Sequence, residues 1–455
     1  MNCADAAQKN KRHATTHFQR SVGLAILNVV MLVACAQTDF DRSGATRGLD
    51  TLMQNTVLSK DQGGDGLQNP AINIIIPDKQ FNYSFASGTA QAWSKELMTV
   101  NHQFHTASVG KTFTAALILQ LSEDGLLGPD GLDTTLLKLS IFDDLTLERL
   151  HIVDGVSYGP EITVRQLLLH SSGLKDQFGD DANGSREDYG REPAPGGLMF
   201  LMQRDMPAHM ECLQDPSCDS SDLITKKLWK HWDPEHPKDP FAGMLNFYVN
   251  QMGHAGYCAP GSCYHYSDIG YVILGLIAEK VAGKTLHGLF RERIFDPLNM
   301  DRSYLAYGVN PDSSRWEENI SDFYMGGIPA VSAGLNLSFD WGGGGVVTTA
   351  VEQNRFFVAL LEGKLFTKPE TLAEMIDWQV IPGMNDYLAG VGLGLSRFKG
   401  PDGLDTWAKY GAWGNGMLFD PQTGAYISGT NNSSSKPSGW WTRIIIVLRE
   451  ASKKD

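Results

Sequence analysis

Residues 104–121, FHTASVGKTFTAALILQL, constrain the chain more than any other stretch because they allow two incompatible sites. Gly110, Lys111 and Thr112 end like a phosphate-binding loop, which would indicate a nucleotide-binding protein. Ser108 and Lys111 instead place a hydroxyl and an amine three residues apart at the start of an apolar, helix-forming segment, which would indicate a serine acyl-transfer enzyme. The other motifs of the sequence decide between these two sites.

The phosphate-loop interpretation fails on glycine spacing. The motif G-x-x-x-x-G-K-[ST] uses both glycines to let backbone N–H groups wrap the phosphates. Counting back from Gly110, the first glycine falls on His105, whose side chain does not permit that turn cheaply. Two other glycine-rich stretches, 342–345 and 390–394, lack the strand, turn, helix and acidic residue of a dinucleotide fold, so we expect turns and close-packed strand positions there.

The serine interpretation has a chemical basis. Positions i and i+3 lie on the same face of a helix, so Lys111 can approach the Ser108 hydroxyl, which is a poor nucleophile until a base removes its proton. An ammonium stripped of water has a lowered pKa and can act as that base, and a helix N-terminus adds positive potential where an oxyanion would form. The S-x-x-K pattern alone is weak, because it occurs often by chance.

The charge of the chain argues against a nucleic-acid partner. It carries 38 Lys and Arg against 52 Asp and Glu, a net charge of −14, whereas phosphate binding rests on clustered cations. With 42% hydrophobic residues, the 455-residue chain can bury a sizeable core, as one large domain with insertions or as two packed domains.

The N-terminal segment is typical of an export signal. Basic residues precede the apolar run VGLAILNVVMLVACA, which is too short to span a bilayer comfortably and has the size of a signal-peptide core. Its end resembles a bacterial lipoprotein signal. We therefore expect a lipoprotein signal peptide over residues 1–35 with Cys35 lipidated, a flexible tether over 36–65, and a periplasm-facing protein of the outer membrane whose only membrane contact is the lipid. A plain secretory signal and a buried start are the alternatives.

Four cysteines in the middle of the chain form two close pairs, Cys212 with Cys218 and Cys258 with Cys263. In an exported chain such pairs indicate disulfides; three connectivities are possible, and the two local ones are favoured. A zinc site is the alternative, but it is disfavoured because the two pairs lie about forty residues apart and neither has the C-x-x-C spacing. A compartment that permits disulfides also holds no ATP, which weakens the nucleotide interpretation further.

Hydrophobic periodicity predicts strands at both ends of the chain and helices between them. We therefore expect an α+β fold, in which an antiparallel sheet built from both chain ends is flanked by helices and interrupted by an inserted, mainly helical region. Residues 175–250 carry little periodicity and are interpreted as a loop-rich insertion. The periodic segments are 71–90 and 387–432 for strands, and 110–125, 163–174, 267–283 and 349–363 for helices.

Two further stretches support the serine interpretation. Tyr266-Ser267-Asp268 begins an amphipathic helix, and Lys409-Tyr410-Gly411-Ala412 lies in a strand. In chain order with S-x-x-K, they resemble the signatures S-x-x-K, Y-x-N and K-T-G of the penicillin-recognising serine enzymes. The resemblance covers about residues 70–435 and is strongest to the class C β-lactamases and their relatives, the serine esterases and D-amino-acid peptidases. Its flanking stretches are ITVRQLLLHSSGL, PGSCYHYSDIGYVILG and WGGGGVVTTAVEQNRF.

The resemblance implies a β-lactamase/transpeptidase-like serine hydrolase domain over residues 66–450, with an atypical insertion at about 175–250. It implies cleavage of an ester, amide or β-lactam bond in a small molecule or peptide, without a cofactor or metal. His170 would belong to a structural turn. His231 and His236 are not expected to bind a metal, because Pro234 breaks the helix that a ligand pair would need.

The resemblance also implies roles for the catalytic residues. Ser108 would form the acyl-enzyme, and Lys111 would take part in proton transfer. Tyr266 would be the general base, its pKa lowered by the positive potential of Lys409. The backbone N–H groups of Ser108 and Ala412 would form the oxyanion hole.

Two substrate-binding positions depart from the family signatures. Asp268 replaces Asn; because an ionised Asp only accepts hydrogen bonds, we expect it to pair with Lys111, raise that lysine's pKa and repel the acylamide carbonyl of ordinary penicillins. Tyr410, before Gly411, replaces Thr, which removes a small hydroxyl and adds bulk. Lys409 would still hold a substrate carboxylate. These departures leave open a second function, a catalytically impaired penicillin-binding-like sensor or binding lipoprotein.

Overall fold

The computed structural model describes most of the chain outside the N-terminal segment and the insertion. The described residues are 40–62, 64–92, 94–180, 255–306, 319–333, 340–400, 403–434 and 439–453, with isolated residues between 198 and 252 and residues 335 and 337. Within them, no helix combines the length and apolar character that a bilayer span requires. The predicted features that lie outside them are the signal segment with Cys35, the pair Cys212 and Cys218, and His231 and His236.

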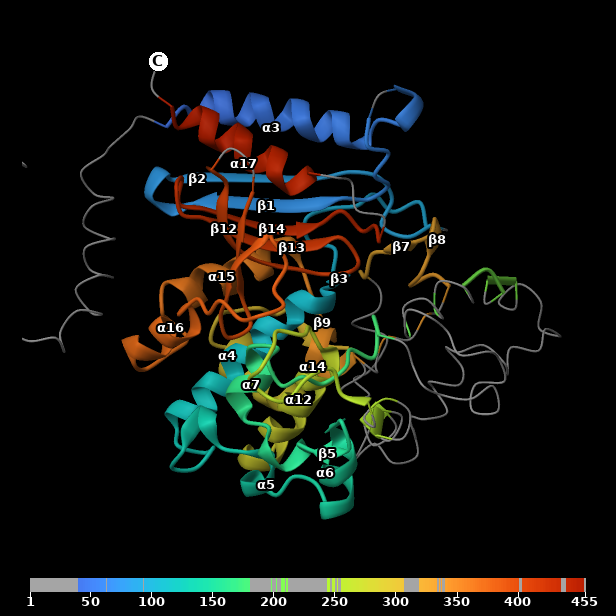
Figure 1. The fold of residues 1–455 in the computed structure, drawn as a ribbon. Helices are drawn as coiled ribbons and strands as arrows, with labels where there is room; N and C mark the ends of the chain where they lie inside the picture. The colour runs from blue at the N-terminus through green and yellow to red at the C-terminus, as the bar shows by residue number, and fades with distance from the viewer. Residues whose placement is uncertain are drawn as a thin grey trace, which may run out of the picture.

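A seven-stranded antiparallel sheet formed from both ends of the chain is the centre of the fold, which confirms the predicted class (Figure 1). The two ends meet where β1 pairs with β14, with Ala71 opposite Thr430. In spatial order the strands are β10 (Leu388–Val391), β11 (Ser396–Lys399), β12 (Asp405–Tyr410), β13 (Asn415–Asp420), β14 (Ala425–Thr430), β1 (Ala71–Ile76) and β2 (Phe81–Ala86).

Two terminal helices, α3 (Arg42–Val57) and α17 (Trp440–Ala451), pack together over one face of the sheet (Figure 1). The expectation of a flexible tether over residues 36–65 is therefore wrong where α3 forms. Ala45, Leu49 and Met53 recur every four residues and are buried in one core with strand residues and Trp440. This apolar stripe is narrow, and the polar residues between its members conceal it in the sequence.

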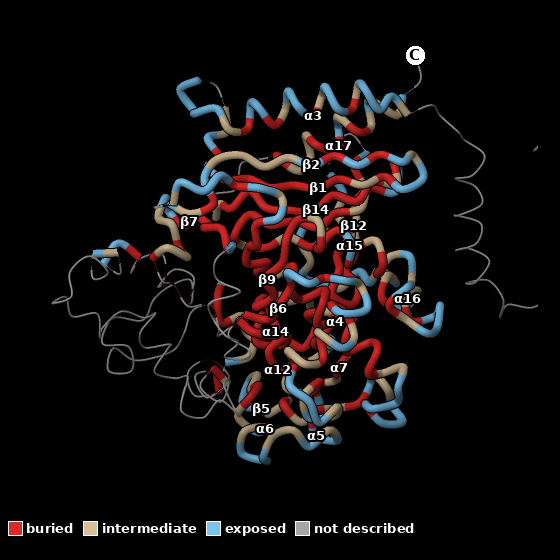
Figure 2. The backbone as a smooth tube through the Cα atoms, turned by 180° about the vertical axis from the view of Figure 1, so that it is seen from behind, coloured by how far each residue is buried: buried red, intermediate tan, exposed pale blue. Residues whose placement is uncertain are grey.

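The other face of the sheet carries α15 (Ala350–Leu361) and, beyond it, a helical region with its own core (Figure 2). At the centre of that region, α4 (Gly110–Glu123) packs against α12 (Asp268–Ala282), and α4 is buried from Gly110 to Leu121. Three of the four predicted helices are confirmed at nearly full length, and the fourth shortens to α7 (Val164–Leu168). The remaining elements are α5 (Leu136–Leu139), α6 (Asp144–Leu150), α13 (Leu286–Phe290), α14 (Trp341–Gly344), α16 (Pro369–Met375), β3 (Phe104–His105), β4 (Ile152–Val153), β5 (Val156–Ser157), β6 (Tyr304–Leu305), β7 (Tyr324–Met325), β8 (Ile328–Pro329) and β9 (Val346–Thr348).

Capping groups determine where two helices of this region begin. At α7, Thr163 and Gln166 form a reciprocal capping box. At α12, Ser267 occupies the cap position but its side chain makes no capping hydrogen bond. The carboxylate of Asp176 accepts from the N–H of Asp268 at 3.1 Å instead. The start of α12 is therefore fixed by a residue from a distant part of the chain.

The glycine run 342–345 forms α14 and close contacts rather than the expected turns and strand positions. A Cβ on Gly342 would lie 2.6 Å from the carbonyl oxygen of Tyr271, and one on Gly344 would lie 2.7 Å from the carbonyl carbon of Ala107. Glycine permits these approaches, which bring α14 against α12 and against the turn before α4. The carbonyl of Gly343 thereby reaches the interior of the helical region.

We expect Leu49→Ala to lower the free energy of unfolding by about 2–5 kcal/mol, because it opens a cavity in the core beneath α3. Gln54→Ala, on the exposed side of the same helix, is the control and should change the free energy little. Urea unfolding curves measure both variants. Equal stability of the two would show that α3 does not contribute to the domain core.

Candidate active site

Ser108 lies in a short helical turn, Ala107–Val109, that runs directly into α4. Ala107 has a φ of 45°, a left-handed conformation that is uncommon for a residue with a side chain and that turns the chain just before the helix. Thr106 anchors the turn from the other side, because its N–H donates to the carbonyl of Val346 at 2.9 Å. The serine hydroxyl therefore stands at the positive end of a buried helix.

Lys111 points its amine at the Ser108 hydroxyl, as the i+3 spacing predicts. Its Nζ lies 3.3 Å from Oγ of Ser108 and donates to the carbonyl of Gly343 at 2.8 Å. The same Nζ forms an ion pair with Oδ1 of Asp268, which confirms the expected pairing. The lysine is fully buried, so its amine ties the nucleophile to α14 and α12 in the absence of water.

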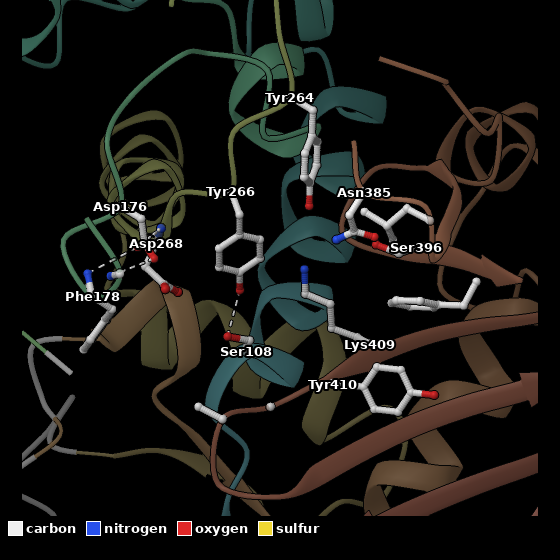
Figure 3. A pocket seen from close by; sticks show the side chains of 15 residues that line it. Ser108, Asp176, Phe178, Tyr264, Tyr266, Asp268, Asn385, Ser396, Lys409 and Tyr410 are labelled. Carbon is white, nitrogen blue, oxygen red and sulfur yellow. Dashed lines mark hydrogen bonds between the residues drawn. The ribbon is translucent and has the colours of Figure 1, made fainter. Parts of the chain in front are cut away.

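Tyr266 completes the contact, because its hydroxyl donates to Oγ of Ser108 at 2.8 Å (Figure 3). Its ring lies against that of His170, with centroids 4.2 Å apart. Nδ1 of His170 accepts from the N–H of Ser267 at 3.2 Å, so this histidine supports the tyrosine loop, in agreement with the structural role expected for it. Two segments far apart in the sequence therefore meet at the Ser108 hydroxyl, and His170 supports one of them from a third.

Burial sets the protonation of both neighbours of Ser108. It lowers the pKa of Lys111 to about 8, against the opposing effect of nearby carboxylates. It raises the pKa of Tyr266 well above its ordinary range. The lowered pKa of Lys111 confirms the expectation for an ammonium stripped of water, whereas the expectation of a lowered pKa for Tyr266 is wrong, because burial raises it. At Lys111 the loss of water outweighs the neighbouring carboxylates, whereas at Tyr266 the carboxylates of Asp176 and Asp340 act in the same direction as burial.

Two further buried carboxylates act on Lys111, and the sequence carries no signal strong enough to predict them. Asp176 accepts from the N–H of Gly179 at 3.2 Å in addition to capping α12, and burial raises its pKa to about 7. Asp340 precedes the glycine run, and burial raises its pKa as well. An Asp after a turn or before glycines is common, and neither pattern indicates how far the carboxylate lies from Lys111.

Lys409 lies on β12 inside the sheet rather than at a solvated edge. It is only 6% exposed, and its Nζ lies 5.0 Å from the centroid of the Tyr266 ring. Burial and the charge of Lys111 lower its pKa. Among the described residues, no acceptor is within hydrogen-bond distance of this amine, which projects into the cavity beside Tyr266 (Figure 3).

Gly411 and Ala412 bring the end of β12 against the Ser108 turn. A Cβ on Gly411 would lie 2.4 Å from the carbonyl oxygen of Thr106, so glycine permits this approach. Ala412 lines the same cavity as Ser108, and in the described part of the chain neither residue's N–H has an acceptor. Two unoccupied donors beside the nucleophile fit the predicted oxyanion hole.

Tyr410 turns its hydroxyl away from Ser108 (Figure 3). Its ring packs edge-on against Phe398, with centroids 5.2 Å apart, and lies 6.4 Å from that of Trp441 on α17. The bulk that replaces the family's Thr therefore packs largely toward the α3–α17 side of the sheet, and it does not fill the space in front of Lys409.

One cavity of about 460 Å³ is lined by Ser108, Asp176, Tyr266, Asp268 and residues 409–412. The disulfide between Cys258 and Cys263 confirms that local pairing. Tyr264 directly follows the loop that this disulfide closes, lines the cavity, and donates its N–H to the carbonyl of Pro382 at 2.6 Å. Across the described ranges, no three His, Cys, Asp or Glu side chains are grouped as metal ligands. The further lining residues are Phe178, Gly179, Asn385, Leu388, Ser396 and Phe398.

Known proteins of similar structure share this architecture. The hydrolase EstCE1, which has promiscuous acyltransferase activity, superposes with a TM-score of 0.63 at 19% identity, covering 90% of this chain and 99% of that one. An octameric penicillin-binding protein homologue from Pyrococcus abyssi gives 0.61 at 19% identity over 88% and 77% of the two chains. The D-amino acid amidase from Ochrobactrum anthropi SV3 gives 0.60 at 20% identity over 89% and 99%.

Similarity in sequence leads to the same family. Penicillin-binding protein 4* of Bacillus subtilis (strain 168) is 25% identical over 227 residues, 50% of this chain and 35% of that protein. The unguisins hydrolase ungD' of Aspergillus campestris is 23% identical over 243 residues, 52% and 33% of the two chains. The matched stretch thus spans about a third of either relative. The family model described as Beta-lactamase matches residues 61–439, so the chain belongs to the Beta-lactamase family.

Proposed function

We propose that the protein is a serine hydrolase that cleaves an ester, amide or β-lactam bond through an acyl-enzyme on Ser108. One observation carries the proposal: a single hydroxyl contacts two proton-carrying groups, the phenol of Tyr266 at 2.8 Å and the amine of Lys111 at 3.3 Å. The longer of the two, between Lys111 and Ser108, is typical of a catalytic hydrogen bond before a substrate binds. The hydrolase and the amidase among the structural relatives support this reaction class.

Lys111 is the proposed base for acylation. Because its pKa is lowered to about 8, part of the population is neutral near pH 7, and neutral Nζ accepts the Ser108 proton as Oγ attacks the carbonyl carbon. The N–H groups of Ser108 and Ala412 hold the oxygen that gains negative charge. Tyr266, kept protonated by burial, donates its proton to the leaving amine or alkoxide and regains one from Lys111. Water then takes the place of Ser108 Oγ as nucleophile and releases the acyl group.

Esters and short amides are the proposed substrates, rather than ordinary acylamino β-lactams. Asp268 presents an acceptor where an acylamide carbonyl requires a donor. Lys409 presents a buried amine suited to a carboxylate. The unhindered space in front of Lys409 supports this part of the proposal, since Tyr410 packs toward the other side of the sheet.

The proposed location is the cell envelope, with Cys35 lipidated and the hydrolase domain facing the periplasm. The disulfide between Cys258 and Cys263 supports export, because such bonds persist in oxidising compartments. The apolar run before Cys35 supports a signal peptide. In this arrangement the lipid is the only contact with the membrane.

We expect Ser108→Ala to abolish labelling by a fluorophosphonate probe and to lower p-nitrophenyl butyrate hydrolysis by at least about 10³-fold, because the nucleophile is lost. Ser122→Ala, at the other end of α4, is the matched control and should react like wild type. Equal labelling of Ser108→Ala and wild type would refute the acyl-enzyme. Labelling without steady ester turnover would favour the impaired binding protein instead.

We expect kcat/KM for that ester to rise with pH to a plateau above about pH 8, as Lys111 loses its proton. The Asp268 carboxylate favours the charged amine, so Asp268→Asn should lower the pKa of Lys111 and move this limb to lower pH. Asp176→Asn tests the other group that titrates nearby, and kcat/KM of this variant should still rise with pH. If the rise of kcat/KM in Asp268→Asn occurs at the same pH as in wild type, or at a higher pH, the assignment of Lys111 as the base is contradicted.

We expect wild type to hydrolyse nitrocefin poorly and Asp268→Asn to increase kcat/KM at least about tenfold, because Asn can donate to the acylamide carbonyl. Asp130→Asn makes the same change at the exposed pair with Lys138 and should have no effect. Steady-state kinetics measure all three proteins. An unchanged rate in Asp268→Asn would show that this charge does not limit β-lactam use.

A further inference from the structure

We infer that the cleft recognises a zwitterion: a short peptide with a free α-ammonium group on the acyl side of Ser108 and a free carboxylate on the leaving-group side. The substrate class named here rests on the proposed hydrolase function. Two buried ionisable side chains carry the inference, because Asp268 and Lys409 face one cavity from opposite sides of the nucleophile (Figure 3).

The acidic side of the cleft holds a surplus of carboxylates. Lys111 lies among Asp268, Asp176 and Asp340, so one amine faces three acids. Oδ1 of Asp268 binds Lys111, whereas Oδ2 has no hydrogen-bond partner within the described residues although Asp268 is only 5% exposed. Asp268 lines the cavity, so a substrate ammonium at this point would give Oδ2 a charged hydrogen-bond donor.

The protonation of Asp176 agrees with this arrangement. Burial raises its pKa to about 7, so near neutral pH part of the population holds a proton at that site. A bound ammonium would favour the ionised carboxylate and replace that proton as the compensating positive charge. A neutral N-acyl group would supply no such charge, and its carbonyl oxygen would face Asp268.

The basic side of the cleft gathers hydrogen-bond donors. The amine of Lys409 has no acceptor in the described part of the chain, and Figure 3 shows it directed toward Tyr264 and Asn385, with Ser396 beside them. Oδ1 of Asn385 accepts from Tyr387 N at 3.1 Å, which leaves the amide N–H groups of its side chain for a ligand. An amine, an amide and hydroxyl groups together suit a carboxylate, whose charge would in turn favour the ammonium form of Lys409.

The position of Ser108 determines which end of the substrate each side receives. Ser108 Oγ and Asp268 Oδ1 contact the same Lys111 amine. An α-ammonium nitrogen is two bonds from the attacked carbonyl carbon, so it reaches Asp268 while that carbon lies at Ser108. Lys409 is on the other side of Tyr266, next to the departing portion (Figure 3). A cavity of about 460 Å³ suits a ligand of dipeptide size.

Four dipeptides that differ only in their ends test the inference: alanyl-alanine, its N-acetyl form, its C-terminal amide and the doubly blocked form, each as D,D and L,L. We expect the free dipeptide of one series to have the highest kcat/KM. Blocking either end should lower it about tenfold, the effect of one charge-assisted hydrogen bond. A preference for the N-acetyl form, or equal values for all four, would overturn the inference.

Two variants that each remove one ionisable side chain test which residue recognises which end of the dipeptide. Asp268→Asn should remove the advantage of the free amine and keep that of the free carboxylate, whereas Lys409→Met should do the reverse. A purely structural role would lower all four rates together. The matched surface changes, Asp130→Asn and Lys138→Met, should leave the order of the four peptides unaltered.

Hydrolysis of p-nitrophenyl butyrate separates failure of the inference from failure of the proposed function. If wild type does not cleave the ester, the hydrolase proposal fails. If it cleaves the ester but no dipeptide, competitive inhibition of ester cleavage by the four dipeptides gives the same comparison. Tightest inhibition by the free dipeptide, with the split between Asp268→Asn and Lys409→Met, supports the zwitterion site, and equal inhibition constants overturn it.

Discussion

The buried amine of Lys111 is the interaction on which the rest of the site depends. It contacts the Ser108 hydroxyl, the carbonyl of Gly343 and the carboxylate of Asp268, which come from three separate segments. An ammonium has three donors, so these partners use its full capacity. Each segment can reach the amine only because the surrounding packing is close, and the glycines of α14 are the clearest case.

Burial and charge act in opposite directions on this amine, and their balance makes it usable as a base. Loss of water lowers the pKa of Lys111 to about 8, while Asp176 and Asp340 oppose that shift. With a single strong acidic partner in water, the lysine would stay an ammonium at all relevant pH values. With no acidic partner, it would stay neutral and hold Ser108 less firmly. If the family's Asn stood in place of Asp268, the amine of Lys111 would have one carboxylate fewer beside it to favour its charged form.

Sequence patterns predicted the parts of this structure that are determined by interactions between residues close in the sequence. The i+3 spacing placed Lys111 beside Ser108, and helical periodicity located α4, α12 and α15 within a few residues. The failures involve long-range contacts. The stripe of Ala45, Leu49 and Met53 is apolar on one narrow face and gains stability only from α17 and the sheet. Likewise, no spacing rule places Asp176 or Asp340 near Lys111, because the chain reaches that point by tertiary packing alone.

The departures at Asp268 and Tyr410 are compatible with the retained Lys409 once the side chains are placed. Tyr410 packs toward Trp441. The replacement of Thr therefore removes a small hydroxyl near Lys409, but the tyrosine ring does not block the space in front of that lysine. Asp268 opposes a substrate carbonyl but favours a substrate cation, and it leaves the far side of the cleft unchanged. A ligand with opposite charges at its two ends therefore satisfies both positions, whereas a neutral acylated ligand presents a carbonyl oxygen to Asp268 and no acceptor of opposite charge to Lys409.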